Sequence, residues 1–154
     1  MIITVGRLGD HHESGHTEYV GRGRGSVLGN PLPVIGRGRW TGEAAAWTSH
    51  LIHAANLTGT EREQAQRALQ CLGFEQGEAA ALYLHVLREQ CRTDTPQRRA
   101  VLRLAALATQ GPVHLQCWCT PRPCHAEHIR TAILGYAQML IERRATAARA
   151  AVPG

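Results

Sequence analysis

The stretch that decides the fold is residues 113–125, Val-His-Leu-Gln-Cys-Trp-Cys-Thr-Pro-Arg-Pro-Cys-His. Apolar or thiol side chains occupy every second position from 113 to 119, which predicts a strand. Pro121 and Pro123 keep the following segment out of a helix. From position 125 to about 144, apolar residues recur at helical spacing, which predicts a long helix. Strand, tight loop and helix form the unit of open α/β folds, whose ligands lie at the carboxyl ends of the strands.

Periodicity and capping residues predict the other elements. Strands are expected at 2–5 and 19–20, and helices at 41–56, 60–72, 78–92 and 95–109. Thr41 and Thr95 are the expected N-caps of their helices. Thr60 and Glu63 have the spacing of a capping box, and Gly73 is expected to end that helix. The glycine-rich stretch 21–38 has little capacity for helix.

The length of 154 residues indicates one domain. We assign residues 1–142 to a single α/β domain, with a helical insertion at about 57–95, and residues 143–154 to a basic tail that frays. The predicted fold class is α/β: a compact, Rossmann-like three-layer domain with a small, mostly parallel sheet and the extra helical insertion.

Composition indicates the location of the protein and the partners that it can have. No apolar run approaches the length of a membrane span, and the N-terminal residues read as a strand without a signal-peptide n-region. We therefore expect a cytoplasmic protein with no membrane partner and with reduced thiols. All 17 basic residues are arginine, and the formal net charge is +5. A charge of this size permits a nucleotide or nucleic acid as partner but establishes neither.

The cysteine loop is the first candidate site. Cys117, Cys119, Cys124 and His125 are the residue types that bind zinc, and His128 is an alternate ligand. Positions i and i+2 of a flat strand are about 6.6 Å apart. Two thiolates on one zinc ion lie roughly 3.8 Å apart. A zinc site therefore requires the strand to bend at Trp118, or the two cysteine side chains to turn toward each other.

A second interpretation of the same loop is catalytic. Cys124 would lie at the start of a helix, where unpaired amides and the helix dipole stabilise a thiolate. His125 and Glu127 would complete the reactive groups, and Arg122 would lower the pKa of the thiol further. The structural alternative is that the cysteines only pack in the core.

The glycine-arginine loop is the second candidate site. Glycines allow a backbone to approach a phosphate closely, and arginines add charge-assisted hydrogen bonds. The candidate phosphate-binding residues are Gly21, Arg22, Gly23, Arg24, Gly29, Asn30 and Arg122. A flexible surface loop is the alternative, with Asn30 as a turn former before Pro31. His11, His12 and His16 form a further polar cluster, for which we favour a solvated loop over a metal site.

Two segments together resemble a known family. Tyr19-Val20-Gly21-Arg22-Gly23 with Gly29-Asn30-Pro31, followed by Cys-Trp-Cys-x-Pro-x-Pro-Cys-His at 117–125, is similar to a small bacterial and phage domain family of unknown function. Where such relatives often continue Cys-His-Gly-Asp, this chain has Ala126-Glu127. The resemblance implies a compact α/β domain in which the two motifs meet in space.

Two functions follow as expectations. The first is an enzyme-like intracellular domain that binds a phosphorylated small molecule, a nucleotide or nucleoside, between the two motifs, as a hydrolase or transferase would. The alternative is a non-catalytic module for nucleic acid or protein, with a structural zinc ion at the cysteine loop. The sequence does not define the substrate, the metal occupancy or the oligomeric state.

Overall fold

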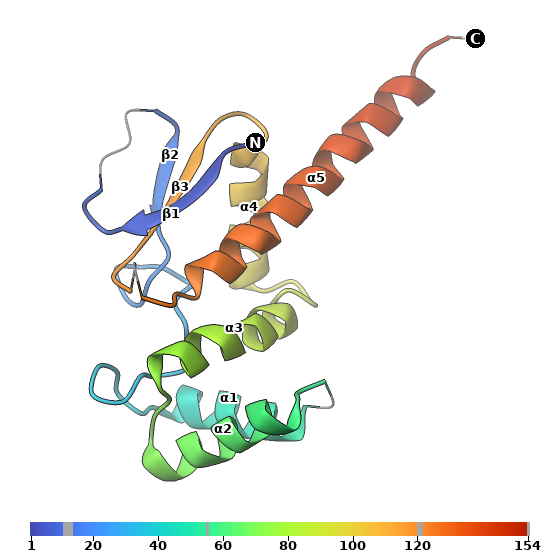
Figure 1. Ribbon diagram of the computed structural model, residues 1–154. Helices are drawn as coiled ribbons and strands as arrows, with labels where there is room; N and C mark the ends of the chain where they lie inside the picture. The colour runs from blue at the N-terminus through green and yellow to red at the C-terminus, as the bar shows by residue number, and fades with distance from the viewer. Residues whose placement is uncertain (11–13, 55, 120–121, 154) are drawn as a thin grey trace.

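The computed structural model describes residues 1–10, 14–54, 56–119 and 122–153 of the chain. His11, His12, Thr120 and Pro121, which entered the sequence interpretation, lie outside the described residues. Three strands and five helices follow in the order β1 (Ile3–Arg7), β2 (His16–Tyr19), α1 (Gly42–His53), α2 (Gly59–Cys71), α3 (Gln76–Gln90), α4 (Pro96–Ala108), β3 (Val113–Cys117) and α5 (Ala126–Ala150). The α/β class and the parallel sheet are confirmed (Figure 1).

The sheet has the order β1-β3-β2, and both pairs are parallel. Ile3 and His16 both stand opposite Val113, so the two edge strands share one register with the central strand. All five residues of β3 are buried, as expected for a strand paired on both sides. The carboxyl ends of the three strands therefore meet at Cys117, where the cysteine loop begins.

One face of the sheet is apolar and packs on helices. Val113, Leu115 and Cys117 join the hydrophobic core, and α4 and α5 pack against each other and against the sheet. The other face carries His114 and Gln116. His114 Nδ1 is 2.7 Å from the hydroxyl of Thr4, and the Gln116 amide donates to the carbonyl of Asp10 at 2.9 Å. Alternate side chains of β3 thus belong to the hydrophobic core on one face of the sheet. Those on the other face make polar contacts with the amino-terminal segment.

The remaining helices form the other end of the molecule. In Figure 1, α1 and α2 lie side by side, and α3 lies between them and the sheet region. Thr41 and Thr95 cap α1 and α4 as predicted, because each side-chain hydroxyl accepts a hydrogen bond from a first-turn amide. Ile35 N donates to Phe74 O and Phe74 N donates to Pro33 O, which joins the glycine-rich loop to the start of α3. This connection places residues 33–37 next to the cysteine loop.

The boundaries of α2 differ from the prediction. The capping box is formed by Thr58 and Glu61, since Thr58 has the extended backbone of an N-cap and Thr60 already lies inside the helix. At the other end, Leu72 and not Gly73 adopts the left-handed conformation, with φ of 56°. Gly73 is required for space instead, because a Cβ there would lie 2.8 Å from Cγ1 of Ile35.

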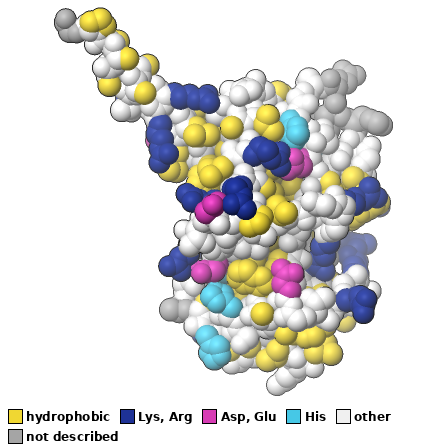
Figure 2. Space-filling view, turned by 180° about the vertical axis from the view of Figure 1, so that it is seen from behind, with side chains coloured by type: hydrophobic (Ala, Val, Ile, Leu, Met, Phe, Trp, Pro, Cys, Tyr) yellow, Lys and Arg dark blue, Asp and Glu magenta, His cyan; other side chains and the backbone are white. Residues whose placement is uncertain are grey.

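The C-terminal segment also differs from the prediction. Residues 143–150 continue α5 to Ala150, where the sequence predicted a frayed tail. This end of α5 projects from the body of the molecule, and Figure 2 shows apolar side chains exposed along it. Its alanines and arginines favour helix without a packing partner, which explains the extension. Among the described residues, no helix combines the length and the apolar character needed to cross a bilayer.

Candidate metal centre and adjoining cavity

The cysteine loop gathers three sulfurs and one imidazole at the carboxyl end of β3. The ligand atoms of Cys117, Cys119, Cys124 and His125 all lie within 4.8 Å of one another. The strand ends at Cys117 and the chain bends at Trp118 and Cys119. This bend removes the spacing conflict, because Cys119 is no longer held at the i+2 position of a flat strand.

The distances to the histidine suit a shared tetrahedral ion. Nδ1 of His125 is 4.0 Å from Sγ of Cys117 and 3.8 Å from Sγ of Cys124. Ligands bound to one zinc ion at about 2.0–2.3 Å are separated by roughly 3.5–3.8 Å. Three thiolates and one imidazole are a donor set that zinc prefers, so these residues fit the group that the sequence predicts.

The orientation of His125 is set by the glycine-arginine loop. Nε2 of His125 lies 2.7 Å from the carbonyl oxygen of Val20, which can only accept a hydrogen bond. Nε2 therefore carries the proton, and Nδ1 faces the three sulfurs with its lone pair when the ring is neutral. The ring also packs edge-on against Tyr83, with the centroids 4.9 Å apart. A metal ligand held by a backbone carbonyl in this way is pre-oriented for its ion.

The pKa values of two thiols in the cluster are shifted in opposite directions. Hydrogen bonds from Cys117, and then from Cys124 and His125, hold the pKa of Cys119 far below its usual range. The contacts of Cys124 with Cys117 and Cys119, together with burial, raise the pKa of Cys124. Burial disfavours the charged form of His125, but the sulfurs of Cys117 and Cys119 outweigh this effect and raise its pKa to about 9. These shifts favour a thiolate at Cys119 and a protonated His125, and a metal ion would displace protons on binding.

Two residues named by the sequence lie apart from the cluster. The ring of His128 lines a different groove, between α3 and α5, and is hydrogen-bonded to the backbone of Ala80. His125, not the alternate His128, is therefore the histidine of the cluster. Glu127 is exposed on the first turn of α5 and is not among the residues that line the cavity. Glu127 follows His125 by two positions, which places it on a different face of the helix.

The glycine-arginine loop lies directly beside the metal centre. The hydroxyl of Tyr19 donates to the carbonyl of Arg22 at 2.8 Å, and the Arg22 guanidinium donates to the carbonyl of Leu32. Gly29 allows this close fold, because a Cβ there would lie 2.9 Å from the carbonyl oxygen of Gly21. Gly21 itself lies under the Tyr19 ring, whose hydroxyl oxygen would be 2.5 Å from an added Cβ. These glycines are thus explained by packing within the loop.

Asn30 has a structural role that the phosphate prediction did not anticipate. Its amide nitrogen donates to the carbonyl of Ala79 at 2.8 Å, and its side-chain oxygen accepts from the amide of Leu32 at 3.0 Å. The side chain is 5% exposed. Because these partners already use its amide group, Asn30 anchors the loop to α3, in agreement with the turn-forming alternative.

Gly23 and Arg24 form the outer turn of the same loop, and neither is among the residues that line the cavity. Both have positive φ, of 76° and 53°. The guanidinium carbon of Arg24 lies 5.7 Å from the ring centroid of Tyr19 and 5.8 Å from that of Trp118. Arg24 therefore contacts aromatic rings at the edge of the site, where the sequence predicted a phosphate contact.

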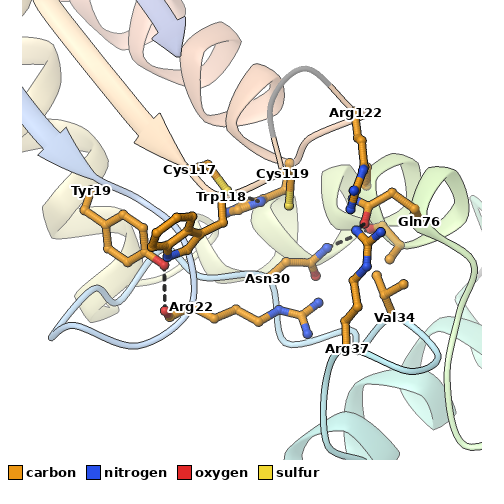
Figure 3. Close-up of a pocket in the computed structure, with 13 residues that line it drawn as sticks. Tyr19, Arg22, Asn30, Val34, Arg37, Gln76, Cys117, Trp118, Cys119 and Arg122 are labelled. Atoms are coloured by element: carbon orange, nitrogen blue, oxygen red, sulfur yellow. Dashed lines mark hydrogen bonds between the residues drawn. The ribbon is translucent and has the colours of Figure 1, made fainter. Parts of the chain in front are cut away.

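A cavity of about 310 Å³ separates the two motifs (Figure 3). Thirteen residues from both motifs and from α3 line it: Tyr19, Arg22, Asn30, Val34, Arg37, Gln76, Ala79, Ala80, Cys117, Trp118, Cys119, Arg122 and His125. None of these described residues is acidic, and three are arginines. The two motifs therefore meet in space around one positively charged cavity.

Sequence reasoning missed Gln76, and it noted Arg37 among the arginines that alternate with glycines without assigning it to the site. The guanidinium of Arg37 donates to the side-chain oxygen of Gln76 at 3.2 Å, and the Gln76 amide donates to the carbonyl of Pro123 at 2.8 Å. Arg37 stands in the arginine-glycine pattern at 37–39, which was a usable signal. Gln76 lies 47 positions before Pro123 and carried no such signal.

The fold and the site define a class: an α/β domain with a cluster of three cysteines and one histidine that can hold a metal ion beside an arginine-lined cavity. The chain belongs to the family described as a domain of unknown function, DUF4326, whose model matches residues 5–135. The match confirms the resemblance to a family of unknown function. No curated protein and no solved structure is significantly similar to the chain.

Proposed function

We propose that the cavity binds a phosphorylated small molecule of the nucleotide or nucleoside class, beside a metal ion that stabilises the cysteine loop. The observation that supports this proposal most directly is the lining of the cavity. It combines Arg22, Arg37 and Arg122 with no described acidic side chain. Guanidinium groups bind phosphate oxygens through paired, charge-assisted hydrogen bonds. The volume is at the lower end of the range for small-molecule sites.

The three arginines divide into two roles. Arg22 is engaged with the carbonyl of Leu32, and its pKa is lowered by loss of solvent although the sulfurs of Cys119 and Cys117 act in the opposite sense. A zinc ion with three thiolates carries a net negative charge, which Arg22 is placed to offset. Arg37 and Arg122 reach the same end of the cavity from different segments of the chain, so they are the proposed phosphate contacts.

The metal ion is proposed to be structural. Four protein ligands complete a tetrahedral shell, whereas catalytic zinc sites keep one position for water or substrate. Cys124 is 8% exposed and does not line the cavity, which favours its role as a ligand over that of a nucleophile. The Rossmann-like arrangement predicted from the sequence fits this proposal, since ligands of parallel sheets lie at the carboxyl ends of their strands. We also propose a cytoplasmic location, where such thiols stay reduced.

A nucleic-acid-binding module with a structural zinc ion is the second candidate. The exposed Trp118 and Arg24 favour it, because single strands are bound by aromatic stacking and by basic side chains. This second candidate function predicts micromolar or tighter binding of oligonucleotides, with an affinity that falls steeply as the salt concentration rises. A small-molecule cavity predicts that a mononucleotide binds as tightly as an oligonucleotide does.

The test combines native mass spectrometry of the purified chain with calorimetric titration of nucleoside monophosphates. Arg37→Ala is expected to weaken phosphate-dependent binding roughly 10- to 150-fold, the range for a hydrogen bond to a charged group. Arg149→Ala, on the projecting end of α5, is the matched control and should bind as the parent does. Equal affinities for the two variants, or no binding of any phosphorylated compound, would refute the proposal.

A further inference from the structure

The cavity has two chemically different ends. Figure 3 shows the rings of Tyr19 and Trp118 next to each other at one end, and the side chains of Arg37, Arg122 and Gln76 at the other. The cysteines and Asn30 lie between them. A ligand that fills the cavity from end to end would therefore need a flat apolar group on one side and an anionic group on the other.

Trp118 is exposed between two of the candidate metal ligands. Trp118 is 55% exposed, and its two neighbours in the chain, Cys117 and Cys119, are candidate metal ligands. A single exposed apolar side chain is ordinary on protein surfaces. Trp118 differs from such a residue because it lines the cavity, where a large ring with only two side-chain torsions offers contact area at little conformational cost.

Arg24 supplies an independent indication that the two rings form a stacking surface. Its guanidinium, a flat cation, lies within 5.8 Å of the centroids of both Tyr19 and Trp118. The backbone of Arg24 is in the left-handed region, with φ of 53°, which is unfavourable for a residue with a Cβ. The loop thus holds a planar cation beside both rings.

We propose that Trp118, supported by Tyr19, is the residue that binds the base of a nucleotide, while Arg37 and Arg122 bind its phosphate. The inference rests on the proposed function and sharpens it, because it makes the aromatic base a requirement for tight binding. A sugar phosphate or inorganic phosphate would contact the cationic end alone. Trp118 is therefore the residue that selects nucleotides over other phosphorylated molecules.

The test compares ligands with and without a base on the full-length, metal-loaded chain. Calorimetric titrations use the four ribonucleoside 5′-monophosphates and ribose 5-phosphate. In the parent protein at least one monophosphate should bind roughly 5- to 150-fold more tightly than ribose 5-phosphate, the range for stacking of one base on an aromatic ring. Trp118→Leu should remove this difference and leave the affinity for ribose 5-phosphate unchanged.

A second variant and two control measurements separate loss of stacking from loss of the fold or of the metal ion. Trp118→Phe should retain most of the preference, because a smaller ring still stacks. Metal content and melting temperature are measured for both variants, since Trp118 lies between two candidate ligands. If all four monophosphates and ribose 5-phosphate bind the parent equally, or if Trp118→Leu keeps the preference, the base-stacking role is overturned while phosphate binding stands. If none of the compounds binds, the proposed function fails and the inference fails with it.

Discussion

Removal of the metal ion should lower the stability of the domain by an amount that can be worked from the site. The four candidate ligands join the end of β3 to the start of α5, so an ion that binds the folded cluster more tightly than the unfolded chain stabilises the folded state. An ion present at 1,000 times its dissociation constant contributes about 4 kcal/mol. For a chain of 154 residues, about 1 kcal/mol shifts the melting temperature by roughly 2–4 °C. A strong chelator should therefore lower the melting temperature by roughly 8–16 °C.

The assay is thermal unfolding followed by circular dichroism, with metal content measured by native mass spectrometry under reducing conditions. Cys117→Ser should lose the ion and melt near the temperature of the chelated parent. Because Cys117 is also a buried core residue, the partly buried ligand Cys119 is replaced by serine as well, and Cys91→Ser, at a partly buried cysteine outside the cluster, is its matched control. The reasoning is refuted if the parent binds no zinc at one ion per chain, or if chelation leaves its melting temperature unchanged.

Three predictions concern the rest of the chain. Gly29→Ala should destabilise by about 1–3 kcal/mol in urea unfolding, because its Cβ would meet backbone atoms of the loop at 2.9 and 3.0 Å; an unchanged midpoint would contradict this packing. Thr58→Ala should cost about 0.5–2 kcal/mol through loss of the N-cap, while Thr60→Ala should cost less, and the reverse order would restore the capping box predicted from sequence. Glu18 is partly buried, which alone would raise its pKa, but hydrogen bonds led by that from Arg103 lower it overall from 4.5. Its contribution to stability is present above pH 4.5 and is lost as the pH falls through the lowered value, so the unfolding free energy of Glu18→Gln should depend less on pH in that window than that of the parent.

The elements that the sequence predicted well are those with strong local signals. Thr41 and Thr95 were identified as caps because a cap depends on residues within one turn of the chain. The same reasoning misplaced the start of α2, since Thr58 and Thr60 both lie three positions before a glutamate and only backbone geometry distinguishes them. The continuation of α5 to Ala150 was missed because an exposed alanine-rich segment has no apolar stripe.

By itself the sequence determined the α/β class, the strand-loop-helix unit and the grouping of Cys117, Cys119 and Cys124 near one histidine, His125 or His128, because these residues lie close together in the chain. Tertiary structure decided the rest. The bend after β3 closed the distance between the sulfurs, and the carbonyl of Val20, 105 positions away, set the ring of His125. Asn30 became an anchor through Ala79, and Gln76 joined the cavity from a segment with no motif of its own. The physical reason is that hydrogen-bond partners and cavity walls depend on distances between remote segments, which the order of residues does not contain.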